Sequence, residues 1–173
     1  SKGVRKKNIR KIAGYPLIYY TIKEALKSKL INQYIVSTDD IDIQKISIKY
    51  GAEAPFLRPK KFSNDKATSV SALKHCVTWA EKKYKIKYDI VVELMCTNPL
   101  KNSYDIDTVL KKIIKTKADS VIAVHRILDQ HPLRVKKIKN DKIIDFCLKE
   151  KKESRRQDLM PFAYLRSGSI YAL

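Results

Sequence analysis

DIVVELMC, residues 89–96, is a nearly continuous apolar run in which Glu93 is the one awkward residue. Runs of this kind are typical of a central strand that is buried on both faces of a sheet. The run leads directly into Thr97, Asn98 and Pro99. We therefore expect a buried strand that ends at Cys96 and a loop that begins at Thr97.

The segments around this run alternate between helix and strand patterns. Thr38, Asp39 and Asp40 are suited to cap one of the helices, which should stop at Gly51. Such alternation predicts a parallel sheet with helices on both faces, where ligands bind at the carboxyl ends of the strands. The loop after Cys96 is therefore placed at the site. Helices are predicted over residues 16–30, 40–50, 69–83 and from a cap at Ser103 onward, and strands over residues 34–37 and 120–125.

The pattern changes in the last third of the chain. Residues 135–138 and 143–146, separated by Asn140 and Asp141, are predicted to form an antiparallel hairpin appended to the main sheet. Residues 150–157 have the composition of a charged loop, and residues 169–173 again resemble a strand.

Length and composition limit the classes of protein that are possible. A chain of 173 residues is expected to form one cored domain. Its three cysteines, Cys76, Cys96 and Cys147, lie in apolar contexts and are expected to be reduced, buried thiols. No run approaches the ~18 apolar residues of a membrane span, and no secretory signal is evident. The sequence thus predicts a cytoplasmic protein that does not interact with membranes.

The formal net charge of +19 suggests a second class, a basic nucleic-acid-binding module. The excess is mostly lysine, however, scattered over helix faces and not interleaved with aromatic residues. An excess of lysine, isoleucine and tyrosine is also what an A/T-rich coding sequence gives. We therefore expect no nucleic-acid partner, and we keep the binding module as an alternative.

The first eight residues, SKGVRKKN, have the composition of a phosphate-binding loop. Ser1 and Gly3 allow backbone N–H groups to approach an anion closely, and Lys2 and Lys7 can neutralise it. Short stretches of lysine and glycine are also common at solvated termini of basic proteins, so this pattern alone is weakly specific.

Three separated stretches together are more specific. They are Ser1–Gly3 with Lys7 and Asn8, then MCTNPLK at residues 95–101, then RRQDL at residues 155–159 with Tyr164 and SGSIY at residues 167–171. Together they resemble the acylneuraminate cytidylyltransferases, the CMP-sialic acid synthetases and their nonulosonate relatives, whose motifs read GGSKG followed by KN, QPTSPLR, and RRQDLP followed by NGAIY. The family's upstream arginine and paired glycines are absent here. Met95 stands where the family has a glutamine.

The resemblance implies a three-layer α/β/α, Rossmann-like nucleotide-diphospho-sugar transferase fold with a small antiparallel appendage. It also implies transfer of CMP from CTP to the anomeric hydroxyl of sialic acid or another 2-keto nine-carbon sugar acid, of the legionaminic or pseudaminic type, with release of pyrophosphate. Mg²⁺ is the implied cofactor, and a homodimer the implied assembly of the intact enzyme. A CMP-Kdo synthetase-like enzyme is the alternative within the same chemistry.

Residue roles follow from the matched motifs. Lys2 and Lys7 are the catalytic candidates, because phosphoryl chemistry depends on positioning and on neutralising charge. The planar guanidinium groups of Arg155 and Arg156 suit a sugar carboxylate, and Asp158 is interpreted as an arginine partner. The nucleotide-binding candidates are Ser1, Lys2, Gly3, Lys7, Asn8, Arg58, Asp65 and Ser69, and the substrate-binding candidates are Thr97, Asn98, Arg155, Arg156, Gln157 and Tyr164.

Two residue types are given structural interpretations. Arg58 could equally be an exposed turn arginine. His75, His125 and His131 have no partners at metal-ligand spacing, and each is most simply a helix, strand or loop histidine.

Relative to the family, residues 1–173 are expected to be a cytidylyltransferase domain that is incomplete at both ends. The family's first strand would precede Ser1, and its metal-binding carboxylates would follow Leu173, so that no metal ligands are expected within residues 1–173. On this interpretation the chain as given would be destabilised and nearly inactive, with a hydrophobic slot open in the middle of its sheet.

Overall fold

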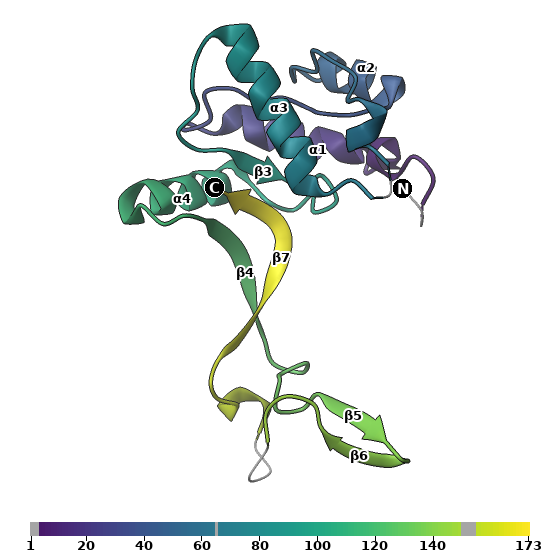
Figure 1. The fold of residues 1–173 in the computed structure, drawn as a ribbon, viewed down its shortest axis with the longest axis vertical. Helices are drawn as coiled ribbons and strands as arrows, with labels where there is room; N and C mark the ends of the chain where they lie inside the picture. The colour runs from purple at the N-terminus through teal and green to yellow at the C-terminus, as the bar shows by residue number, and fades with distance from the viewer. Residues whose placement is uncertain (1–3, 65, 150–154) are drawn as a thin grey trace. The chain divides into compact units, whose positions relative to one another are not determined.

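The computed structural model describes residues 4–64, 66–149 and 155–173, and Figure 1 shows their elements. The chain divides into two compact units. Unit 1 comprises Ser1–Ile122 and Gly168–Leu173, and unit 2 comprises Ala123–Ser167. The sequence led us to expect one cored unit, whereas the structure has a larger and a smaller unit, and each is described by itself.

Unit 1 is a mixture of helices and short strands. The segments predicted to be helical are helical, with ends that differ by one to three residues from the sequence pattern. The elements are the 3-10 helix η1 (Lys7–Ile9), β1 (Lys11–Ile12), β2 (Tyr15–Pro16), α1 (Leu17–Lys27), α2 (Ile41–Lys49), the 3-10 helix η2 (Lys60–Phe62), α3 (Ser69–Tyr84), β3 (Val92–Leu94) and α4 (Ser103–Thr116).

The core of unit 1 forms where α1 meets the segments on either side of α2. Ile18 and Ile22 of α1 are buried together with Val36, Ala52 and Ala54. Helix α1 also contacts α2 and α4. The buried face of α4 consists of Ile106, Val109, Leu110 and Ile113, which is the apolar stripe of an amphipathic helix.

The central sheet differs from the predicted parallel sheet. Two longer strands, β4 (Val121–Ile127) and β7 (Ala163–Ala172), join β3 in the order β3-β7-β4 (Figure 1). Strand β7 runs antiparallel to β3, with Val92 opposite Ala172 and Leu94 opposite Ile170. A parallel neighbour would require a crossover connection, usually a helix. The described residues between β4 and β7 contain only a hairpin and a 3-10 turn, and β7 pairs antiparallel.

Two further strand predictions need correction. Residues 34–37 form no named strand. Ile35 forms an isolated parallel bridge with Glu53, and Thr38, directly after the segment, forms one with Leu57. Strand β3 is only half-buried, whereas full burial on both faces was expected. Among the described residues its pairing is to β7 alone, which leaves Glu93 partly accessible. Burial still raises the pKa of the Glu93 carboxyl.

The helix caps explain where two helices begin. Asp40 caps α2 as predicted, because its carboxylate accepts hydrogen bonds from the N–H groups of Asp42 and Ile43. Helix α4 is capped by Asn102, so the prediction of Ser103 was wrong by one residue. The Asn102 side chain accepts from the Asp105 N–H at 2.9 Å, and Asp105 accepts from the Asn102 N–H at 3.1 Å. This reciprocal pair is a capping box, which satisfies two N–H groups at once.

Unit 2 contains the predicted hairpin. Strands β5 (Lys136–Lys139) and β6 (Lys142–Asp145) pair antiparallel around Asn140 and Asp141. Both turn residues have positive φ, at 51° and 60°, as the tight turn of a two-residue hairpin requires. The 3-10 helix η3 (Arg156–Asp158) lies in the segment expected to be a charged loop, of which residues 150–154 lie outside the described residues.

The described part of the chain has no helix with the length and apolar character needed to cross a bilayer.

The capping box gives a test of the fold. Replacing Asn102 with Ala should lower the free energy of unfolding by about 1 kcal/mol, because it removes the side chain that satisfies the Asp105 N–H. Replacing the neighbouring Ser103 with Ala is the matched control and should change stability by less than about 0.5 kcal/mol. Thermal unfolding of both variants measures the difference. A larger loss of stability in the Ser103 variant than in the Asn102 variant would show that Ser103 is the helix cap.

Candidate functional site

Unit 1 contains a cavity of about 1720 Å³. Part of its wall is polar and comes from the N-terminal turn and the loops around α2 and η2. Much of the rest is apolar and comes from β3, α1, α3 and α4, although charged residues such as Lys87, Asp89, Lys117 and Asp119 also line the cavity. Polar lining residues of the first part are Arg5, Lys6, Lys7, Asn8, Ser37, Thr38, Asp39, Asp40, Arg58, Ser63 and Ser69, and apolar lining residues include Ile18, Val36, Leu73, Val77, Val92, Leu94, Leu110 and Ile113.

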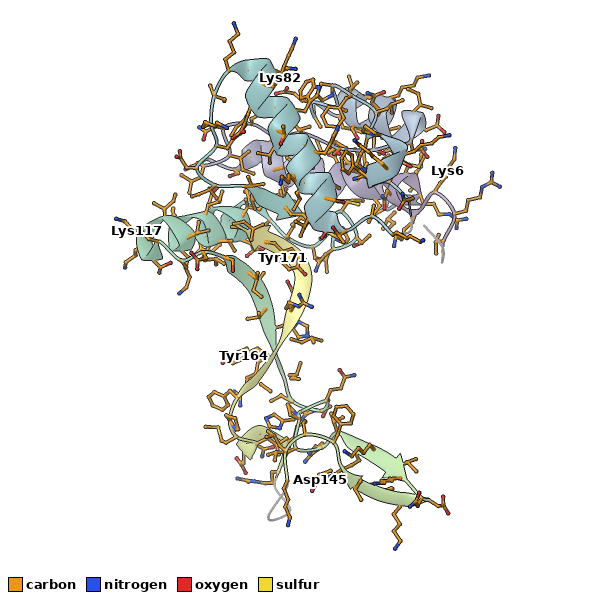
Figure 2. All side chains as sticks on the ribbon, in the orientation of Figure 1. Lys6, Lys82, Lys117, Asp145, Tyr164 and Tyr171 are labelled. Atoms are coloured by element: carbon orange, nitrogen blue, oxygen red, sulfur yellow. The ribbon has the colours of Figure 1, made fainter. Side chains whose placement is uncertain are left out.

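The N-terminal turn places two lysines in different roles. Lys6 has a left-handed backbone, with φ 52°, and starts η1. Its ammonium group donates to the Asp42 carboxylate at 2.5 Å, and this hydrogen bond raises the pKa of Lys6 and lowers that of Asp42. Lys6 is thereby engaged with α2 (labelled in Figure 2), whereas Lys7 and Asn8 line the cavity. Ser1, Lys2 and Gly3 lie outside the described residues.

Arg58 lies in the cavity wall and is held there by neighbouring residues. Its backbone N–H donates to Thr38 O at 2.7 Å, and its Nε donates to Ser63 Oγ at 3.0 Å. One terminal nitrogen lies 3.7 Å from Asp39, and the side chain is 23% exposed. Arg58 is therefore half-buried and oriented by its neighbours, which contradicts the alternative of an exposed turn arginine.

Ser69 starts α3 and also lines the cavity, next to the loop of η2. The helix is capped by Thr68, whose hydroxyl accepts from the Ser71 N–H at 3.1 Å. Asp65, the other candidate in this loop, lies outside the described residues. The structure thus brings Lys7, Asn8, Arg58 and Ser69 to one cavity from three separate stretches of sequence.

The loop after β3 begins at the same cavity, because Met95 and Cys96 line it. Thr97 follows on the surface, and Asn98 is half-buried with its N–H donating to Met95 O at 3.2 Å. These two substrate-binding candidates therefore lie directly after cavity-lining residues, as the strand-then-loop pattern predicted.

Lys101 is a residue of this loop that sequence reasoning missed. It is only 5% exposed, and its ammonium group donates to Thr21 Oγ1 at 3.0 Å, Met95 O at 2.7 Å and Asn98 O at 2.6 Å. Burial lowers the pKa of Lys101 to about 8. The available signal was its place in the MCTNPLK stretch, where the family motif has an arginine.

Cys96 connects the loop electrostatically to the N-terminal turn. Burial raises the pKa of its thiol, while the positive charges of Lys101 and Lys7 act in the opposite direction. Cys96 and Ile9 also pack against the same core cluster. The loop after β3 and the turn that carries Lys7 therefore share one neighbourhood.

The arginine candidates lie in unit 2 and are already paired with carboxylates. Arg155 Nε donates to Asp158 at 2.6 Å, which confirms the interpretation of Asp158 as an arginine partner. Arg156 contacts both carboxylate oxygens of Asp129, at 3.2 and 3.3 Å, a partner that the sequence did not reveal. Gln157 lies in η3, and Tyr164 is exposed on β7 (Figure 2). That these side chains contact the sugar acid stays a prediction.

The histidines have the structural roles expected of them. His75 lies on α3 with its ring against Phe56 and Phe62, and His125 lies on β4. His131 is buried in a loop, where its Nε2 donates to Pro161 O at 2.8 Å and its Nδ1 accepts from the Leu133 N–H at 3.3 Å. Within residues 4–64, 66–149 and 155–173, no three His, Cys, Asp or Glu side chains gather closely enough to hold a metal ion.

All three cysteines are free, as expected, but their burial differs from the expectation. Cys76 and Cys96 are half-buried. Cys147, which follows β6, is exposed.

Comparison with known proteins identifies the family of this chain. The cytidylyltransferase family model matches residues 1–171, which is almost the whole chain. The chain belongs to the cytidylyltransferase family. Its fold and its cavity can therefore be examined as those of an enzyme.

Curated relatives of this cytidylyltransferase act on related sugar acids, according to their names. The chain is 33% identical over 172 residues to the pseudaminic acid cytidylyltransferase of Campylobacter jejuni subsp. jejuni serotype O:23/36, covering 99% of this chain and 72% of that protein. It is 35% identical over 130 residues to the CMP-N,N'-diacetyllegionaminic acid synthase of Legionella pneumophila, covering 73% of this chain and 54% of that protein. It is 34% identical over 111 residues to the N-acylneuraminate cytidylyltransferase of Escherichia coli O18:K1:H7, covering 64% of this chain and 25% of that protein.

A solved structure supports the fold. The CMP:2-keto-3-deoxy-manno-octonic acid synthetase complexed with CTP superposes with a TM-score of 0.67, at 21% identity, covering 99% of this chain and 68% of that one. The mixed α/β fold of this cytidylyltransferase is therefore the nucleotidyltransferase fold. The finer expectation of three layers stays a prediction, and the expectation of parallel strands is corrected by the antiparallel pairing of β3 with β7.

The cysteines allow the cavity wall to be tested chemically. Burial raises the pKa of the Cys76 thiol to about 11, so its reactive thiolate is scarce at pH 8. A thiol reagent at pH 8 should modify exposed Cys147 first, and Cys76 roughly 100-fold more slowly. Raising the pH toward 10 should accelerate Cys76 more than Cys147. Mass spectrometry of digested protein assigns each site, with Cys147→Ser as the control that removes the fast phase. Fast modification of Cys76 at pH 8 would contradict the described burial.

Proposed function

We propose that this cytidylyltransferase transfers CMP from CTP to the anomeric hydroxyl of a nonulosonic acid of the sialic, legionaminic or pseudaminic type. The observation that carries the proposal is the cavity of unit 1, in which Lys7, Asn8, Arg58 and Ser69 lie together beside the loop after β3. Relatives at about one-third identity, whose names specify such acids, support the acceptor class.

In the proposed reaction the anomeric oxygen attacks the α-phosphorus of CTP. A new P–O bond forms, the bond from the α-phosphorus to the bridging oxygen breaks, pyrophosphate leaves, and the attacking hydroxyl loses its proton. Charge accumulates on the phosphate oxygens during this exchange. The protein's main contributions are to hold the two substrates in line and to supply positive charge where negative charge develops.

Lys7 is the proposed source of that positive charge in the described residues. Lys6 also lines the cavity, but its ammonium group is bound to Asp42; Lys7 lies on the same wall, where its mobile ammonium group can reach a triphosphate. Arg58 and Ser69 are proposed to bind the nucleoside end, together with Asn8. Arg58 suits this role because Ser63 and Asp39 hold it half-buried before any ligand arrives.

The acceptor is proposed to lie against Thr97 and Asn98, after the end of β3. Separately, Arg155 and Arg156 of unit 2 are proposed as carboxylate-binding groups, because planar guanidinium groups can bind a carboxylate through two hydrogen bonds. Met95 occupies the position of the family's glutamine, and it is the reason to test several acceptors.

Magnesium remains an implied cofactor of the family chemistry, and the described residues offer no carboxylate cluster for it. Asp40 is used as a helix cap, while Asp39 and Asp158 face arginines. We therefore assign no step of the reaction to a metal held by these residues.

We also propose that the intact enzyme is a homodimer. Unit 2 exposes large apolar side chains on its hairpin and near β7, and exposed apolar patches mark interaction surfaces. They are Ile138, Ile143, Phe146, Met160 and Phe162. The expected cytoplasmic location stays a prediction.

Two alternatives are kept. One is a CMP-Kdo synthetase-like acceptor choice, which the RRQDL stretch disfavours. The other is a nucleic-acid-binding module, which the charge favours and the scattered placement of lysines disfavours. Lys82 on α3 and Lys117 at the C-terminal cap of α4, for example, are both exposed but belong to different elements (Figure 2).

The decisive experiment incubates the intact enzyme with CTP, magnesium and, separately, pseudaminic, legionaminic, N-acetylneuraminic and Kdo acids. We expect a CMP conjugate and stoichiometric pyrophosphate with at least one of the three nonulosonic acids, and little with Kdo. Mass spectrometry identifies the conjugate. Turnover with Kdo alone would select the alternative acceptor, and turnover with none would reject the proposed function.

Variants separate the role of Lys7 from general charge. Lys7→Ala should lower kcat/KM for CTP roughly 100-fold, as the loss of one charged donor to a transition state does. Lys115→Ala on α4 removes an exposed lysine that does not line the cavity and should leave kcat/KM unchanged. Equal effects of the two substitutions would contradict the proposed site.

A further inference from the structure

Lys101 is a buried ammonium group whose donors are fully used. A lysine ammonium has three N–H donors and no acceptor. Here the three oxygens within hydrogen-bond distance are Thr21 Oγ1, Met95 O and Asn98 O, at 3.0, 2.7 and 2.6 Å. The number of donors matches the number of acceptors, so the group has one well-defined orientation.

The three acceptors belong to two different parts of unit 1. Thr21 is fully buried on α1, between core residues Ile18 and Ile22. Met95 and Asn98 are the first and last residues of the turn after β3, and the Asn98 N–H closes that turn onto Met95 O. Lys101 therefore fastens the turn to a rigid helix of the core.

Met95 is held from both sides. Its N–H donates to Ser169 O of β7 at 3.0 Å, and its carbonyl accepts from Lys101. The segment between these fixed points and the second carbonyl, at Asn98, is only two residues long, Cys96 and Thr97. Their backbone has little freedom while the three hydrogen bonds persist.

None of the three partners of Lys101 is a carboxylate, so the contact is not an ordinary ion pair. Burying a charge in this way is unfavourable unless its hydrogen bonds are complete. Truncating the lysine would leave two carbonyls and a hydroxyl without this donor. Leaving a buried acceptor unsatisfied costs more free energy than the hydrogen bond itself contributes. The effect of Lys101 is therefore concentrated on the geometry of the 95–98 turn.

We propose that Lys101 is a positioning residue, which holds the 95–98 turn so that Thr97 and Asn98 face the acceptor sugar acid. The predicted effect on binding of the acceptor rests on the proposed function. The fixed geometry of the turn does not depend on it. We therefore expect Lys101 to affect binding of the acceptor and not binding of CTP, because Lys7 and Arg58, the proposed CTP-binding residues, lie on other loops.

The structural part is tested without any substrate. Lys101→Met keeps a side chain of similar length and removes all three donors, and Ile22→Val is a control that weakens the core by roughly 0.5–1.5 kcal/mol without touching the turn. Hydrogen–deuterium exchange should show the Asn98 N–H exchanging at least tenfold faster in Lys101→Met than in Ile22→Val. Equal exchange at Asn98 in both variants would overturn the proposal. Should Lys101→Met not fold, Lys101→Gln, with a shorter side chain and two donors, serves in the same comparison.

The functional part uses steady-state kinetics with the acid that the enzyme accepts. We expect KM for the acid to rise about tenfold in Lys101→Met while KM for CTP stays within twofold, and Ile22→Val to change neither. A parallel rise in both KM values would show a merely structural role and overturn the proposal. If the intact wild-type enzyme accepts no acid, the proposed function fails, and the exchange comparison still decides whether Lys101 holds the turn.

Discussion

The antiparallel pairing of β3 with β7 is the constraint on which the candidate site depends. Val91 and Leu173 exchange two backbone hydrogen bonds, at 3.0 and 2.9 Å, and Met95 donates to Ser169 at the other end of β3. These bonds fix where β3 ends. Because Cys96 then packs on the core of α1, the following loop begins at the cavity. Ile9 packs on the same core, which brings the N-terminal turn to that cavity as well.

Two of the cations that line the polar part of the cavity are paired with carboxylates. Lys6 is bound to Asp42 and Arg58 lies near Asp39, so each of these cations is oriented by a carboxylate. Lys7 lines the cavity and acts on Cys96 across it. A phosphate-binding wall needs this combination, in which fixed groups set the shape and a mobile ammonium follows the anion.

Much of the fold was readable from the sequence because it is determined locally. The apolar spacing of α1 and α4, the Asp40 cap and the turn at Asn140 and Asp141 each depend on residues within a few positions of one another. The direction of β7 was not readable, since it depends on pairing with a strand more than seventy residues earlier. The half-burial of β3 has the same non-local origin.

The site was predicted in part for a similar reason. Motif spacing placed Lys7, Asn8, Arg58 and Ser69 among the nucleotide candidates, and the structure brings them to one cavity. Motif spacing did not reveal Lys101. A lysine in a polar loop is expected to be solvated, and its buried partner Thr21 lies eighty positions earlier in the sequence. Asp129 was missed likewise, being a surface aspartate until Arg156 is placed beside it.

A crystal structure of the protein with CTP tests the central claim most directly, namely that the cavity of unit 1 holds the nucleotide. The account predicts the triphosphate at the polar part of the cavity, with Lys7 Nζ about 2.7–3.1 Å from a phosphate oxygen and Arg58 still beside Ser63. CTP bound at another surface, with Lys7 directed into solvent, would contradict it.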